Sequence, residues 1–250
     1  MDLQLKGKTA LVTGASMGIG RAIAKSLALE GVRVCITARR GEMLEALSKE
    51  IVAAGGEAPH IVLQDMMAED AAKRLNDAAY TALGRIDILV NSAGGSRSLK
   101  LDSAEEEWME QMTLNFTRVR QLALLVVQGM IRNNWGRIIN ISGKSEPSNL
   151  SGAPPAKAGL HLFAKALSRD VGKHGITVNS IAPGKIMSEQ IRRKYSPELR
   201  ANQSAKEIPV GRYGEPEELA VLATFLASPL ACYITGTVIP VDGGLRKYAY

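Results

Sequence analysis

The chain has few cysteines, few aromatic residues and no long hydrophobic run. Its two cysteines, Cys35 and Cys232, are too few for a disulfide framework or a four-cysteine zinc site. It has three phenylalanines, two tryptophans and no basic stripe interleaved with aromatics, which argues against binding nucleic acid by base stacking. The longest mostly apolar run, residues 122–130, contains Gln128 and is too short to cross a bilayer. We therefore expect no metal, nucleic acid or membrane among its partners.

The rest of the composition is that of a folded protein. Of 250 residues 46% are hydrophobic and the mean hydropathy is −0.02, which excludes wholesale disorder and allows a large core. The opening residues, M-D-L-Q, lack the charged and then apolar pattern of an export signal, so we expect a cytoplasmic location. The formal net charge of +6 predicts attraction to an anion without identifying the anion.

Short β-branched segments alternate with longer amphipathic segments along the chain. Alternating strands and helices require parallel pairing with right-handed crossovers, because parallel strands need a long return connection. We predict an α/β fold, a single-domain Rossmann-type doubly wound parallel sheet with helices on both faces, over residues 1–250. The expected strands are residues 9–13, 32–37, 58–63, 86–90, 137–141, 176–181 and 238–241.

A glycine-rich turn follows the first expected strand and leads directly into a helix. Residues 13–20 read T-G-A-S-M-G-I-G. Glycine allows the backbone to approach a pyrophosphate, and a helix N-terminus offers unpaired N–H groups and the positive end of its dipole. A dinucleotide site is favoured over a tight turn without a ligand, because the motif lies between a strand and a helix. The predicted contacts are Gly14, Ser16, Met17, Gly18, Ile19 and Gly20.

Two arginines follow the second expected strand. An acidic residue there binds the ribose 2′-hydroxyl of NAD, whereas arginine accommodates the 2′-phosphate of NADP. This sequence has Arg39 and Arg40, so NADP(H) is preferred over NAD(H). The alternative is a pair of solvated surface arginines.

Residues 184–211 interrupt the alternation of strands and helices, and we predict a lid or substrate insertion there. Within residues 185–206 six lysines and arginines face only Glu189 and Glu198, a local excess of four positive charges. With Arg39 and Arg40 this excess equals the net charge of the chain. The charge distribution therefore favours a phosphorylated cofactor and an acidic substrate.

The sequence resembles the short-chain dehydrogenase/reductase family, of the kind that includes 3-oxoacyl-acyl-carrier-protein reductases. The resemblance extends over residues 8–244, and its markers occur in the order that the family shows. These are the T-G-x-x-x-G-x-G run from Thr13, Asp65, the N-S-A-G run from Asn91, Asn115, Asn179, Pro183 with Gly184, and the V-D-G-G run from Val241.

The resemblance implies further cofactor contacts. Asp65 and Met66 should border the adenine ring, and Asn91, Ala93 and Gly94 should line the adenosine ribose. The nicotinamide amide should be held by Pro183, Gly184, Ile186 and Ser188. Ser92 departs from the family, which more often has a second asparagine there. The family also implies a homotetramer, or a dimer.

The catalytic motif of similar enzymes is incomplete here. Those enzymes transfer hydride between nicotinamide and a carbonyl or alcohol, and a tyrosine four residues before a lysine moves the proton. Lys157 is present, but Ala153 occupies the tyrosine position. Gly143 falls at the usual serine position, next to Ser142. We therefore predict Asn115, Ser142 and Lys157 as catalytic-site residues, with no proton donor assigned.

Several side chains are candidates for the missing acid. Lys157 itself can act once its charge is destabilised, and the others are Lys144, Glu146, Tyr195, Tyr248 and Tyr250. The favoured function is NADP(H)-dependent oxidation or reduction of a small carbonyl or alcohol compound. The alternatives are a dehydratase or epimerase on the same scaffold, and a non-catalytic NADP(H)-binding sensor or partner subunit.

Overall fold

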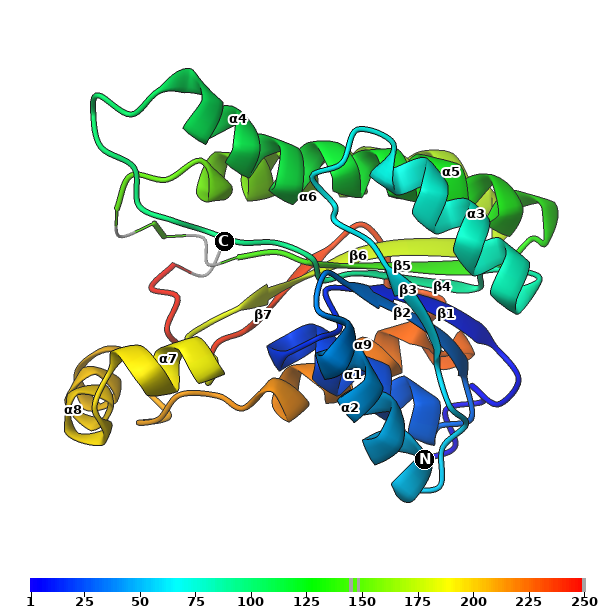
Figure 1. The fold of residues 1–250 in the computed structure, drawn as a ribbon, viewed down its shortest axis with the longest axis horizontal. Helices are drawn as coiled ribbons and strands as arrows, with labels where there is room; N and C mark the ends of the chain where they lie inside the picture. Colours follow the sequence, from blue (N-terminus) through cyan, green and yellow to red (C-terminus); the bar gives the residue numbers. More distant parts are fainter. Residues whose placement is uncertain (144–145, 148, 249–250) are drawn as a thin grey trace.

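Seven strands form one parallel sheet in the order β3-β2-β1-β4-β5-β6-β7 (Figure 1). The computed structural model describes residues 1–143, 146–147 and 149–248. All seven expected strands are present, and no end differs from the expected one by more than two residues. The strands are β1 (Thr9–Thr13), β2 (Arg33–Ala38), β3 (His60–Leu63), β4 (Ile88–Asn91), β5 (Gly136–Ile141), β6 (Ile176–Pro183) and β7 (Val238–Val241). The prediction of a doubly wound parallel sheet is therefore confirmed.

Helices cover both faces of the sheet (Figure 1). One layer contains α1 (Gly18–Leu29), α2 (Gly41–Ala53) and α9 (Pro216–Ala227). The other contains α3 (Ala71–Leu83), α4 (Glu105–Met112), α5 (Arg118–Arg132) and α6 (Ala153–Val171). Every residue of β1 and β5 is buried, because helices exclude water from both faces of a central parallel strand. Short turns η2 (Gly172–His174) and η3 (Pro229–Ala231) precede β6 and β7.

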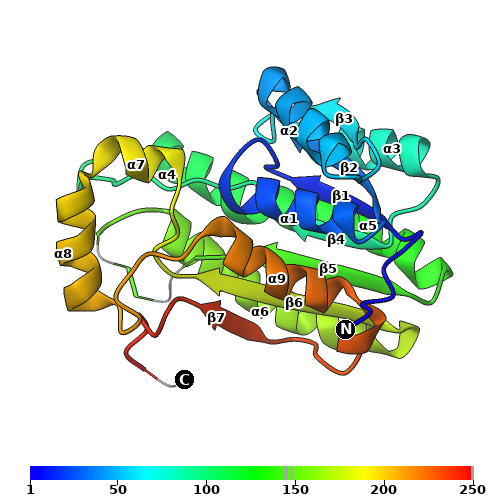
Figure 2. The ribbon, with the colours of Figure 1, turned by 90° about the horizontal axis from the view of Figure 1, so that it is seen from below.

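The predicted insertion at 184–211 contains two helices. These are α7 (Glu189–Lys194) and α8 (Pro197–Glu207). In both Figure 1 and Figure 2 they lie beyond one end of the sheet, apart from the two helical layers. Among the helices of the described residues, none has the length and apolar character that crossing a membrane requires.

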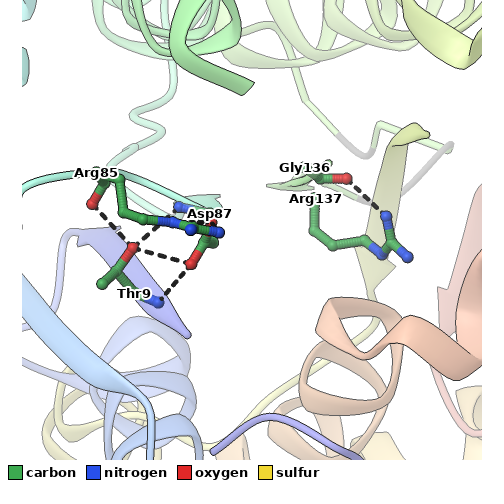
Figure 3. Close-up of polar contacts among 5 residues, drawn as sticks. All are labelled: Thr9, Arg85, Asp87, Gly136 and Arg137. Atoms are coloured by element: carbon green, nitrogen blue, oxygen red, sulfur yellow. Dashed lines mark hydrogen bonds and ion pairs between the residues drawn. The ribbon is translucent and has the colours of Figure 1, made fainter. Parts of the chain in front are cut away.

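A buried polar cluster joins β1 to β4 at their N-terminal ends (Figure 3). The Asp87 carboxylate accepts hydrogen bonds from the Thr9 backbone N–H at 3.0 Å and from Arg85 Nε at 2.7 Å. The side chain of Asp87 is 1% exposed, whereas that of Arg85 is 47% exposed. The backbone carbonyl of Asp87 also accepts a hydrogen bond from the Arg137 N–H in β5, so the cluster ties three central strands together.

The neighbouring Arg137 is buried without a carboxylate partner among the described residues. Its guanidinium donates to the carbonyl oxygens of Gly136 (2.8 Å), Gly175 (3.0 Å) and Ser228 (3.1 Å). It also lies 4.5 Å from the centre of the Trp135 ring. Burial holds the pKa of Arg137 below its ordinary value. The three carbonyl groups and the Trp135 ring stabilise its positive charge near the N-terminal end of β5.

Candidate functional site

A large cavity opens at the C-terminal ends of the strands, between β1 and β4. At this point the order of the strands reverses, because β2 and β3 lie on one side of β1 and β4 to β7 on the other. Open α/β sheets bind ligands at such a switch point. The cavity has a volume of about 870 Å³, and residues from nearly all the loops at this end line it. Fifteen of the predicted site residues lie together there: Gly14, Ser16, Met17, Ile19, Gly20, Arg39, Arg40, Asp65, Met66, Ala93, Gly94, Asn115, Ser142, Lys157 and Pro183.

The glycine turn before α1 needs the residues it has. Gly14 has φ +68°, and a Cβ on it would lie 2.8 Å from the backbone N and Cα of Ala93. Thr13 fixes this approach, because its hydroxyl accepts hydrogen bonds from the N–H groups of Ser92 and Ala93, both at 3.0 Å. A side chain at position 14 would therefore separate the two loops that form the floor of the cavity.

The first turn of α1 is free to bind an anion. Its N-cap residue, Met17, makes no capping hydrogen bond, and no acidic residue lies in the first turn. Unpaired N–H groups at the positive end of a helix dipole suit a pyrophosphate.

The two arginines after β2 lie on the same side of the cavity as the glycine turn. Arg40 donates to Ser16 Oγ at 3.4 Å and contacts Met17 Sδ at 3.1 Å, which holds it across that turn. Arg39 is exposed and lines the cavity. These residues fit the phosphate groups of a phosphorylated dinucleotide.

Five predicted cofactor contacts do not line this cavity: Gly18, Asn91, Gly184, Ile186 and Ser188. The Asn91 amide is buried and donates to Asn140 Oδ1 at 2.9 Å. Ser188 caps α7 by accepting a hydrogen bond from the Ile191 N–H at 3.2 Å. Their part in binding a cofactor remains a prediction.

Asn115 lies where the helix between α4 and α5 changes its hydrogen bonding. The segment η1 (Thr113–Thr117) is π-helical, and such segments often occur at functional sites. The Asn115 side chain donates to the Gly95 carbonyl and accepts from the Gly95 N–H, at 2.8 and 3.2 Å. It therefore fixes the loop after β4 against the helix.

Lys157 lies one helical turn after Ala153 and lines the cavity. Its Nζ donates to the Ile141 carbonyl at 2.9 Å. Burial lowers the pKa of Lys157 to about 8, because the charged ammonium loses hydration there. Ala153 presents only a methyl group to the same cavity.

Gly143, at the position where similar enzymes have a serine, has room for a side chain. A Cβ on Gly143 would lie 3.8 Å from Lys157 Cγ, which is an ordinary contact distance. The hydroxyl of Ser142 donates to the Ile181 carbonyl at 3.2 Å, which directs it toward β6.

Three of the other proposed acids, all of them described residues, do not line the cavity. Glu146 accepts a hydrogen bond from the Lys247 N–H at 3.0 Å, and neither Tyr195 nor Tyr248 lines the cavity. Lys144 and Tyr250 lie outside the described residues. Of the residues that line the cavity, Arg39, Arg40, Asp65, Glu110 and Lys157 carry titratable side chains.

The positive charge of the insertion is partly neutralised. Lys185 pairs with Glu207 at 2.7 Å, and Arg192 pairs with Glu215 at 3.4 Å. Both carboxylates lie beyond residues 185–206, so they were left out of the charge count for that segment. The count of four excess positive charges is therefore too high for the insertion. An acidic substrate remains a prediction with less support.

Sequence reasoning missed a polar wall beside Ala153. Ser96, Ser151 and Glu110 line the cavity there. The sequence offered one signal for these residues, their closeness to known positions. Ser96 follows the N-S-A-G run by two residues, and Ser151 precedes Ala153 by two. No group of three His, Cys, Asp or Glu side chains suited to a metal occurs within residues 1–143, 146–147 and 149–248.

Known proteins resemble the chain along its length. A family model described as Enoyl-(Acyl carrier protein) reductase matches residues 14–246. The 3-oxoacyl-(acyl-carrier-protein) reductase FabG of Aquifex aeolicus is 38% identical over 259 residues, covering 98% of this chain and 100% of that protein.

Solved structures agree with this similarity. One is a Pseudomonas aeruginosa RhlG/NADP active-site complex, 36% identical with a TM-score of 0.88, covering 97% of this chain and 98% of that one. Another is a 7α-hydroxysteroid dehydrogenase with NADH and 7-oxo glycochenodeoxycholic acid. It is 31% identical with a TM-score of 0.91, covering 97% and 96% of the two chains. With its parallel sheet and glycine turn, the chain belongs to the short-chain dehydrogenase/reductase family of oxidoreductases.

Proposed function

We propose that the protein is an NADP(H)-dependent oxidoreductase that interconverts a small carbonyl compound and its alcohol. One observation carries this proposal: a single cavity has an uncapped helix N-terminus and two arginines on one side, and Lys157 beside Ala153 on the other. Bound there, a nicotinamide supplies or accepts hydride, and the protein must hold the proton.

Arg39 and Arg40 support the choice of NADP over NAD. They follow β2, where a 2′-phosphate is recognised in this fold, and arginine binds phosphate through two parallel hydrogen bonds. Neither of the two positions directly after β2 holds a carboxylate that would repel a phosphate. Related structures contain either cofactor, so this choice rests on the arginines.

Lys157 is the group that holds the proton in this proposal. Arginine does not in general serve as a proton donor in proteins, which leaves Lys157, Glu110 and Asp65 among the titratable residues of the cavity. The Glu110 carboxylate pairs with Arg97. Asp65 accepts a hydrogen bond from the Met67 N–H and follows β3, on the side of the cavity proposed for the adenine ring. A lysine with a pKa of about 8 can donate a proton in reduction and accept one in oxidation.

The cofactor assignment predicts tighter binding of NADPH than of NADH in a fluorescence titration. Replacing Arg39 by alanine should weaken NADPH binding by about 10- to 150-fold, since one charged hydrogen-bonding partner contributes about 1.5–3 kcal/mol, and leave NADH binding unchanged. Arg33→Ala is the matched control, because Arg33 begins β2 but does not line the cavity. Equal affinity of the unmodified protein for the two cofactors would contradict the assignment.

Ala153 supports a second candidate, a non-catalytic protein that binds NADP(H) as a sensor or partner subunit. A methyl group cannot move a proton, so the side chain at position 153 cannot do what the tyrosine of similar enzymes does. Oxidation of NADPH that depends on an added carbonyl compound excludes this candidate. Tight NADPH binding without turnover on a broad panel of carbonyl compounds would favour it.

A further inference from the structure

Three hydrogen-bonding side chains form a connected row beside Ala153. Ser96 comes from the loop after β4, Gln111 from α4, and Ser151 lies two residues before Ala153. Ser96 and Ser151 line the cavity, while Ser151 and Gln111 are each only 5% exposed. None of the three has a part in cofactor binding or in the proton step proposed above.

The direction of the hydrogen bonds in this row is fixed. The oxygen Oε1 of Gln111 accepts from the backbone N–H of Arg97 at 3.3 Å, which identifies it as the oxygen of the amide. The hydroxyl of Ser151 therefore donates to that oxygen, at 2.8 Å. A serine has one proton, so Ser151 has none left to give.

The hydroxyl of Ser96 is oriented as a consequence. Its oxygen lies 2.9 Å from Ser151 Oγ, and of the two only Ser96 still has a proton to donate. The Ala153 N–H also donates to Ser151 Oγ, at 3.3 Å. Ser96 thus points its proton at Ser151 and leaves its lone pairs free as acceptors at the cavity.

We propose that Ser96 accepts a hydrogen bond from a hydroxyl group of the substrate, so that the substrate is a hydroxylated carbonyl compound. This inference rests on the proposed function, which makes the cavity a carbonyl site. Glu110 also lines the cavity, and carboxyl oxygens accept hydrogen bonds, which adds to the preference for a donor. A hydroxyl is favoured over an ammonium group, because Lys157 already places a positive charge in the cavity.

The test measures binding of paired ketones to the protein loaded with NADP⁺, where the ketones have no hydride to receive. The pairs are hydroxyacetone with methoxyacetone, and 4-hydroxy-2-butanone with 4-methoxy-2-butanone. Within each pair the oxygen is kept and only its proton is replaced by a methyl group. We expect the hydroxyl member of at least one pair to bind about 3- to 10-fold more tightly, the size of one hydrogen bond.

Two variants separate the acceptor role of Ser96 from a merely structural one. Ser96→Ala should remove the preference by weakening the hydroxy-ketone, and leave the methoxy-ketone unchanged. Ser151→Ala frees the Ser96 proton, so Ser96 can donate to the ether oxygen and the methoxy-ketone should bind more tightly. Gln111→Met removes the anchor of the row and should act like Ser151→Ala.

The control is Ser98→Ala. Ser98 lies in the same loop and accepts a hydrogen bond from Asn149 Nδ2 at 2.8 Å, but it does not line the cavity. Equal affinity within both ketone pairs, or a preference that survives Ser96→Ala, overturns the inference. Failure to bind NADP⁺ at all overturns the proposed function instead, so the two failures are distinguished.

Discussion

Replacing Lys157 by methionine is expected to lower kcat for carbonyl reduction by about 10²- to 10⁴-fold, the usual contribution of a positioned acid. Methionine keeps much of the length and apolar character of the side chain but has no proton to give. The loss should be large because Ala153 leaves no phenol to share the task. Steady-state kinetics with saturating NADPH measures the effect.

The pH dependence of the unmodified protein should follow the same group. Burial lowers the pKa of Lys157 to about 8, and the ammonium form is the acid. Reduction should therefore be constant below about pH 8 and fall as the pH rises above it. Oxidation of the alcohol requires the free amine and should rise through the same pH. A reduction rate that stays flat from pH 7 to pH 10 would contradict the assignment.

Stability provides a readout that does not depend on turnover. The unfolded lysine titrates near its ordinary pKa of about 10.4, so between about pH 8 and pH 10 the unfolded state binds a proton that the folded state lacks. The free energy of unfolding of the unmodified protein should therefore rise with pH in this window, relative to Lys157→Met. Lys165 lies on the exposed side of the same helix. Lys165→Met should therefore match the unmodified protein both in kcat and in the pH dependence of its free energy of unfolding.

The sheet could be predicted from the sequence because its signals are local. Each central strand is a short β-branched run followed by an amphipathic helix, as in residues 9–29, and parallel pairing follows from that order. The tight turn at Gly14 was equally predictable, since glycine permits the positive φ found there, whereas its close approach to Ala93 is seen only in the structure.

The wall around Ala153 could not be predicted, because it depends on contacts between distant segments. Gln111 and Ser151 are 40 residues apart, and their hydrogen bond arises only when α4 packs beside the start of α6. Charge counting failed for a similar reason. Glu207 and Glu215 neutralise Lys185 and Arg192 from outside the counted segment.

Replacing Asp87 by alanine is expected to lower the free energy of unfolding by about 3 kcal/mol, because it leaves the buried N–H of Thr9 without its acceptor. The Thr9 hydroxyl keeps an acceptor, because the Arg85 carbonyl lies 2.8 Å from it, closer than Asp87 Oδ2 at 3.2 Å. Arg85 contributes less to the loss, since its half-exposed guanidinium regains water when the carboxylate is removed. Urea denaturation followed by circular dichroism measures the change.

Two further variants test whether the loss comes from the buried acceptor. Asp87→Asn keeps one oxygen for Thr9 and should lose about half as much stability. Asp77→Ala removes an exposed carboxylate paired with Lys73 on α3 and should leave the denaturation midpoint unchanged. A loss for Asp87→Ala no greater than that for Asp77→Ala would contradict the role assigned to the cluster.

The position of Asp87 predicts that this loss leaves the ligand site intact. The cluster joins β1 to β4 at their N-terminal ends (Figure 3). The cavity opens at the C-terminal ends of the same strands. In Asp87→Ala, NADP⁺ should therefore bind with unchanged affinity at low temperature, where the variant is still folded. Because a ligand that binds only the folded state raises its stability, saturating NADP⁺ should raise the urea midpoints of the variant and the unmodified protein alike.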